Sequence, residues 1–114
     1  MTAARGPAFG RRLFAVTLVA GYADGVREHD DPATVTIRDF TFLPARLSIV
    51  VGQLVEWINR DDVPHSVVHL AHPHGFKSGV LFQGERFSFR FDRPGQYQYA
   101  CGVYRHMRGI VLVG

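Results

Sequence analysis

The alternation of apolar and polar residues along this chain constrains its fold more than any other feature. It is clearest from Glu85 to Phe91, where three phenylalanines face one way and the polar residues between them the other. Similar runs occupy 35–42 (with a bulge at 38–39), 47–51, 54–59, 66–68, 96–101 and 110–113. No segment has a convincing apolar period of 3.6 residues. The pattern therefore predicts an all-β fold, a small antiparallel two-sheet sandwich or barrel of about seven or eight strands.

Residues 1–23 have the organisation of an export signal. Three arginines (Arg5, Arg11 and Arg12) precede the apolar run Leu13–Ala20, and Gly21–Ala23 is a small-x-small cleavage site. Cleavage is expected after Ala23. The apolar run is short for a Sec signal, and Arg11–Phe14 resembles part of a twin-arginine motif, so either export route is open. The other reading is an uncleaved tail, although eight apolar residues cannot span a bilayer.

The signal divides the chain into a leader, a flexible lead-in at 24–33 and one domain at 34–114. It predicts a periplasmic or otherwise extracytoplasmic protein with no stable membrane insertion after cleavage. It also changes the charge: the formal charge of +3 becomes zero, because three basic residues leave with the leader and ten remain against ten acidic ones. A neutral domain argues against nucleic acid as a partner, since binding phosphates needs a net basic surface.

Cys101, His106 and Met107 crowd into seven residues between two of the expected strands. Cys101 is the only cysteine, so it has no internal disulfide partner and is buried, reactive or metal-bound. A further histidine, His65, follows Pro64 at the start of an expected strand. Thiolate, thioether and imidazole ligands select copper over hard cations.

With these features the chain resembles the cupredoxins, the blue-copper proteins that include amicyanin, plastocyanin and pseudoazurin. The resemblance covers roughly 34–114, and its landmarks are Thr36–Pro44, Gly52–Asn59, Asp62–Val67, Pro94–Cys101 and Met107–Gly109. It implies a Greek-key β-sandwich that binds one copper ion, transfers single electrons between redox partner proteins and is a monomer. By matching positions, His65 is the first imidazole ligand, Cys101 the thiolate and Met107 the weak axial ligand.

Tyr104 occupies the position where the resemblance implies the second histidine ligand. The amicyanin-like loop has the spacing C-x2-H-x2-M, and here the third residue after Cys101 is a tyrosine. A phenolate ligand would have to overcome a reference pKa of about 10. Two alternatives supply an imidazole: His106, at the C-x4-H spacing of azurin, or a histidine of the 69–74 loop (His69, His72 or His74). A third leaves His65, Cys101 and Met107 alone, a set that suits three-coordinate Cu(I).

Other functions stay open beside electron transfer. The missing imidazole and the histidine-rich loop fit a Cu(I) carrier with a copper-trafficking partner, and an inert buried Cys101 would fit a metal-free binding module. Arg105, Arg108 and Lys77 are either a solvated rim or a patch that steers an acidic redox partner. The sequence contains no Ser/His/Asp arrangement, zinc-type cluster or phosphate-binding glycine motif, so no enzyme activity is predicted.

Overall fold

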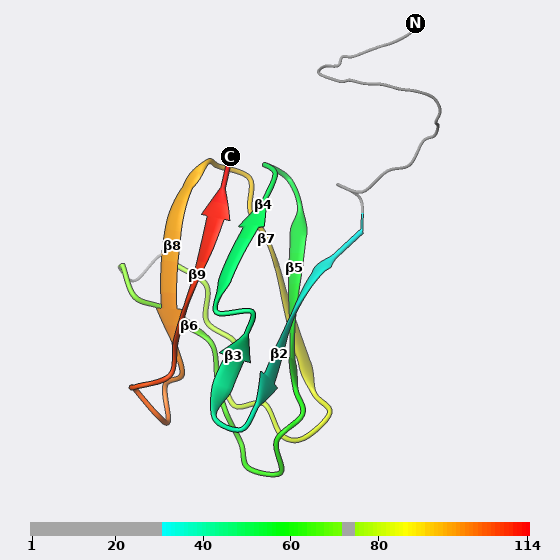
Figure 1. Ribbon diagram of the computed structural model, residues 1–114, viewed down its shortest axis with the longest axis vertical. Helices are drawn as coiled ribbons and strands as arrows, with labels where there is room; N and C mark the ends of the chain where they lie inside the picture. Colours follow the sequence, from blue (N-terminus) through cyan, green and yellow to red (C-terminus); the bar gives the residue numbers. More distant parts are fainter. Residues whose placement is uncertain (1–30, 72–74) are drawn as a thin grey trace, which may run out of the picture.

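The computed structural model describes residues 31–71 and 75–114, and these residues form eight β-strands and no helix. Figure 1 shows the strands running along the long axis of the molecule. Their bounds are β2 Ala33–Arg38, β3 Thr41–Leu43, β4 Arg46–Ile49, β5 Leu54–Asn59, β6 Val68–His69, β7 Arg86–Arg90, β8 Gly95–Ala100 and β9 Arg108–Val113.

The strands form two four-stranded sheets, ordered β3-β2-β5-β7 and β4-β9-β8-β6. The chain changes sheets repeatedly: β4 leaves the sheet of β2 and β3, β5 returns to it, and β6 crosses again. The expected all-β sandwich is therefore confirmed. The expectation of purely antiparallel pairing is wrong at two places, because β2 pairs with β5 and β4 with β9 in parallel. These crossovers bring strands of the same direction side by side.

The run at 35–42 is a second difference from the sequence prediction. It is not one bulged strand but the hairpin of β2 and β3, with Asp39 and Phe40 in the turn between them. Both residues have positive φ, 54° and 58°. Phe40 is not a core residue, because 42% of its surface is exposed.

The core lies between the sheets and is centred on the fully buried Trp57 of β5. Aromatic rings surround it: Phe76 stacks on Trp57 at a centroid distance of 5.6 Å, and Tyr99 meets it edge-on at 5.4 Å. Phe91 of the alternating run is buried as well, whereas Phe87 and Phe89 are half-buried. Burying such rings is the main favourable contribution to folding of a sandwich this small.

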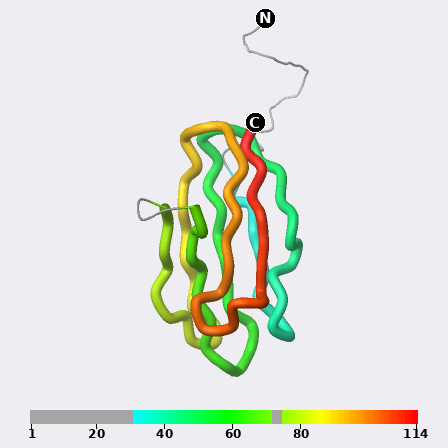
Figure 2. The backbone as a smooth tube through the Cα atoms, turned by 90° about the vertical axis from the view of Figure 1, so that its left-hand side faces the viewer, coloured from blue at the N-terminus to red at the C-terminus, as the bar shows by residue number. Residues whose placement is uncertain are grey.

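Three connections meet at one end of the sandwich, away from the C-terminus: the β2–β3 turn, the β5–β6 loop and the β8–β9 loop. Figure 2 shows the last two side by side. The described part of the chain contains no helix long and apolar enough to cross a membrane. The predicted leader lies outside the described residues.

Candidate metal centre

The β8–β9 hairpin positions Cys101 and Met107 at this end. The two strands pair in antiparallel register up to Ala100 and Arg108, so the loop begins and ends at one place in the sheet. Its base is closed by the Cys101 N–H, which donates to the Met107 carbonyl at 3.1 Å. Cys101 is fully buried and Met107 is 3% exposed. The hairpin therefore places a thiol and a thioether at neighbouring buried positions.

The Cys101 sulfur accepts hydrogen bonds from three backbone N–H groups. Ser66, Val103 and Tyr104 each donate at 3.4 Å. Donors directed at one sulfur stabilise negative charge on it. One donor comes from the β5–β6 loop and two from the hairpin loop, so both loops shape the environment of the thiolate that a metal would need.

The second loop, between β5 and β6, is held in place by Asn59. Its side-chain amide is fully buried and donates to the carbonyls of Val63 at 3.0 Å and Leu81 at 2.9 Å. Its side-chain oxygen accepts the Asp61 N–H at 2.9 Å. The His65 backbone, in turn, exchanges two hydrogen bonds with Leu81. These bonds fix the backbone on both sides of the residue that carries the imidazole.

His65 is fully buried, and its two ring nitrogens face different groups. Nε2 lies 2.7 Å from Oδ2 of Asp61, whereas Nδ1 lies 3.7 Å from the Cys101 sulfur. Burial alone would raise the pKa of Asp61, but the N–H groups of Phe40 and Asp39, together with the His65 ring, bring it below its usual value. An ionised carboxylate only accepts hydrogen bonds, so Asp61 is placed to accept one from Nε2 of His65.

The donor set fits a soft metal ion. The separation of 3.7 Å between Nδ1 and sulfur is within the span of roughly 4.3 Å that one metal–sulfur and one metal–nitrogen bond cover together. The nearby Met107 adds a thioether, the third donor type that copper sites use. Within 31–71 and 75–114 no group of three or more His, Cys, Asp and Glu side chains is placed to hold a metal.

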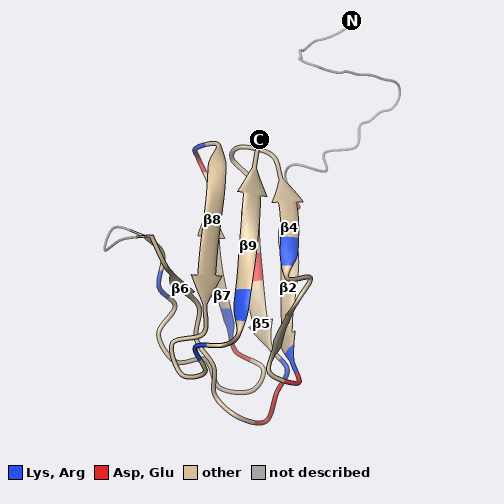
Figure 3. Cartoon of the chain, turned by 60° about the vertical axis from the view of Figure 1, so that its left-hand side comes forward, with Lys and Arg blue, Asp and Glu red and all other residues tan. Residues whose placement is uncertain are grey.

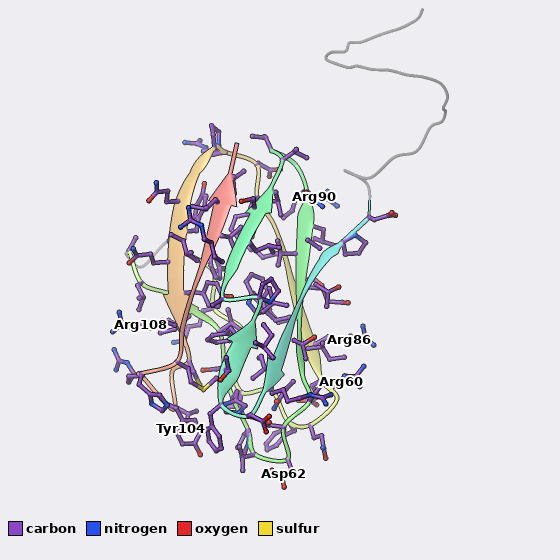
Figure 4. All side chains as sticks on the ribbon, in the orientation of Figure 1. Arg60, Asp62, Arg86, Arg90, Tyr104 and Arg108 are labelled. Carbon is purple, nitrogen blue, oxygen red and sulfur yellow. The ribbon has the colours of Figure 1, made fainter. Side chains whose placement is uncertain are left out.

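Aromatic rings occupy the side of His65 where the second histidine was expected. The Tyr104 ring meets His65 at a centroid distance of 5.4 Å and Phe40 at 5.0 Å, and Phe40 meets His65 at 5.4 Å. Tyr104 is half-buried, and Figure 4 shows it at the same end of the sandwich as Asp62 of the β5–β6 loop. Phe40 and Tyr104 thus form an aromatic cluster with the buried imidazole.

The remaining histidines lie elsewhere or outside the described residues. His106 is exposed on the hairpin loop. His69 is a residue of β6, and its ring stacks on Phe76 at a centroid distance of 4.8 Å with an interplanar angle of 5°. His72 and His74 lie outside the described residues.

Sequence reasoning missed three residues that surround His65: Asn59, Asp61 and Phe40. The alternation pattern places Asn59 at the end of the run 54–59 and Phe40 in the run 35–42, and Asp61 lies between the predicted strands. The Asx-type spacing of Asn59 and Asp61 is a recognisable signal for a side chain that bonds to the backbone two residues on. The contact between Asp61 and Phe40 joins residues 21 positions apart, and no local pattern reveals it.

Known proteins share this architecture and about a third of the aligned sequence. Residues 11–113 match the cupredoxin-like domain family. Amicyanin-alpha of Methylorubrum extorquens is 32% identical over 101 residues, which is 84% of each chain. The structure of a novel purple cupredoxin from Nitrosopumilus maritimus superposes with a TM-score of 0.69 at 30% identity, covering 72% of this chain and 99% of that one. A copper-containing nitrite reductase from Thermus scotoductus gives 0.70 at 33% identity, covering 84% of this chain but 25% of its own. The chain belongs to the cupredoxin family.

Proposed function

We propose that this chain binds one copper ion through Nδ1 of His65, the sulfur of Cys101 and the thioether of Met107, and carries single electrons between partner proteins. The observation that carries the proposal is the buried pair of Nδ1 and sulfur, 3.7 Å apart. Copper supplies a one-electron couple when bound. The relatives named above, two of them cupredoxins and one a copper-containing enzyme, support the choice of metal.

The surroundings of the three donors suit electron transfer because they are stiff. The hydrogen bonds of Asn59 hold the His65 loop, and three N–H groups hold the Cys101 sulfur. Donors that move little between oxidation states cost little reorganisation when an electron passes. The match to the nitrite reductase covers a quarter of that chain, so we propose an electron carrier and not an enzyme.

A second candidate function is a Cu(I) carrier, favoured by the half-buried Tyr104 where a second imidazole was expected. A site of one imidazole, one thiolate and one thioether is rich in soft sulfur ligands, which select Cu(I). In this function the protein delivers Cu(I) to a trafficking partner in an extracytoplasmic compartment after export.

A cleft beside Cys101 is the proposed docking surface for the partner. It encloses about 390 Å³ and is lined by Leu70, Lys77, Val80, Val103, Cys101 and Arg105, among others. Val80 and Val103 are 54% and 48% exposed. Figure 3 shows basic segments next to β6 and in the β8–β9 loop. Lys77 and Arg105 are the charged residues of the cleft, so a partner with an apolar side chain flanked by carboxylates fits it best.

A copper titration of the mature domain, residues 24–114, tests the proposal. Cu(II) and Cu(I) are added separately while the visible spectrum is recorded. Electron transfer predicts tight binding of both ions and an intense thiolate-to-copper absorption band with Cu(II). Tight Cu(I) binding without a coloured Cu(II) form would contradict electron transfer and favour the carrier function instead. If neither ion binds, the proposal is wrong and only the fold stays assigned.

The variant Tyr104→His tests the register of the site. It restores the C-x2-H-x2-M spacing, so we expect it to form an intensely coloured Cu(II) site whatever the wild-type protein does. Val103→His, one position earlier, is the matched control and should not produce the band. A colourless Tyr104→His variant with Cu(II) bound would show that the ligand assignment is wrong.

A further inference from the structure

The Asp61 carboxylate joins three groups that are distant in sequence. Oδ1 accepts the Asp39 N–H at 2.6 Å, and Oδ2 accepts the Phe40 N–H at 3.0 Å and faces Nε2 of His65 at 2.7 Å. Asp61 is itself buried, with 9% of its surface exposed. Hydrogen bonds to an ionised acceptor are stronger than neutral ones, and burial strengthens them further.

Two of these bonds hold an unusual turn. Asp39 and Phe40 are both left-handed, with φ of 54° and 58°, a conformation that residues with side chains rarely adopt. Such backbone persists where the surroundings over-determine it, and it clusters at functional sites. Here the carboxylate holds both N–H groups of the turn, and the turn directs the Phe40 ring onto the edge of His65.

The third contact, between Asp61 and Nε2 of His65, determines whether Nδ1, the nitrogen that faces the Cys101 sulfur, carries a proton. A neutral imidazole has one N–H and one lone pair, and the partner of one nitrogen fixes the role of the other. We propose that Asp61 is a positioning residue that keeps the His65 proton on Nε2, thereby presenting the Nδ1 lone pair to the metal, and that holds Phe40 over the ring. The role of this lone pair in copper binding rests on the proposed function, whereas the tautomer and the Phe40 contact belong to the metal-free protein.

The test uses the metal-free full domain, 15N-labelled, at a pH where the imidazole is neutral. Nitrogen shifts of the His65 ring report which nitrogen carries the proton. In the wild-type protein we expect the tautomer with the proton on Nε2. In Asp61→Asn the population of this tautomer should fall by about half, because an amide can donate as well as accept a hydrogen bond. The Asp39 and Phe40 amides should also exchange with solvent faster in the variant. Asp62→Asn, which changes the exposed neighbouring carboxylate, is the matched control and should leave all three readouts unchanged.

Cu(I) affinity, measured by competition with a chelator, is the second readout. Asp61→Asn should weaken it by about 10–100-fold, the usual effect of removing the partner of a ligating histidine, and Asp62→Asn should not. A wild-type protein with the proton on Nδ1 would overturn the proposal, and this result needs no variant. An unchanged tautomer and unchanged amide exchange in Asp61→Asn would overturn it too. If the tautomer changes as expected but the wild-type protein binds no copper, the positioning role stands and the proposed function fails.

Discussion

In the loop between β5 and β6, the side chains of Asn59 and Asp61 donate and accept the hydrogen bonds that fix the backbone. In the loop between β8 and β9, backbone N–H groups are the donors, and they bond to backbone carbonyls, to the Cys101 sulfur and to the Ser66 hydroxyl. Asn59 and Asp61 hold the first loop through bonds to residues as distant as Leu81 and Asp39. The second loop is held by strand register and by N–H groups that point at the Cys101 sulfur. The side chains of the first loop should therefore be sensitive to substitution, and most of those of the second should not.

Asn59→Ala should have the largest effect on stability. It removes the side-chain partners of the Val63 carbonyl and of the Asp61 N–H, and one of the two donors to the Leu81 carbonyl, which keeps the His65 N–H. A buried group left unpaired costs about 1–3 kcal/mol. With partial relaxation, we expect the free energy of unfolding to fall by about 3–5 kcal/mol, measured by urea denaturation.

Gln98→Ala, on the exposed face of β8, is the control for Asn59→Ala and should change stability by less than about 0.5 kcal/mol. A loss below about 1 kcal/mol in Asn59→Ala would contradict the assignment of this side chain as the support of the loop.

The same contrast explains what could be predicted from the sequence. The period-2 runs revealed the sandwich because strand burial is local and repetitive, and the spacing of Cys101 and Met107 revealed the hairpin loop because one connection contains both. The parallel pairs β2/β5 and β4/β9 depend on where the chain crosses between sheets, which no single run encodes. The support of His65 depends on contacts with Asp39, Phe40 and Leu81, all distant in sequence.

Tyr99, two residues before Cys101, makes the strand that supports the hairpin loop sensitive to alkali. Burial raises the pKa of Tyr99 to about 12 from 10.0. The phenol therefore keeps its proton up to a higher pH in the folded state than in the unfolded state. Its contribution to the free energy of unfolding is complete below pH 10 and is lost as the pH rises to about 12.

Over that window the free energy of unfolding should fall by about 2–3 kcal/mol, measured by urea denaturation at a series of pH values. Tyr99→Phe has no phenol to ionise and should lose less stability over the same range. An equal loss in both proteins would mean that another group causes the alkaline transition.

Ser66→Ala tests the point where the two loops touch. The hydroxyl oxygen of Ser66 accepts the Gly102 N–H at 2.8 Å, and the variant leaves that N–H without its partner. We expect stability to fall by about 1–2 kcal/mol and the Gly102 amide to exchange faster. Ser88→Ala, an exposed serine of β7, is the control and should change neither. Unchanged exchange at Gly102 in Ser66→Ala would show that the loops are held together by other contacts.

His106→Ala should have the smallest effect, although His106 belongs to the same loop as Cys101 and Met107. Its side chain is exposed, and the loop around it is held by backbone groups and by the strands on either side. We expect a change in stability below about 0.5 kcal/mol by urea denaturation, and Cu(I) affinity within about twofold of the wild-type value, measured by chelator competition, because a solvated side chain contributes little to a buried site. A loss of affinity as large as the 10–100-fold expected for Asp61→Asn would mean that the hairpin loop rearranges to bring His106 to the metal. That result would reverse the comparison, since the second loop would then be the adaptable part of the site and the first loop its fixed frame.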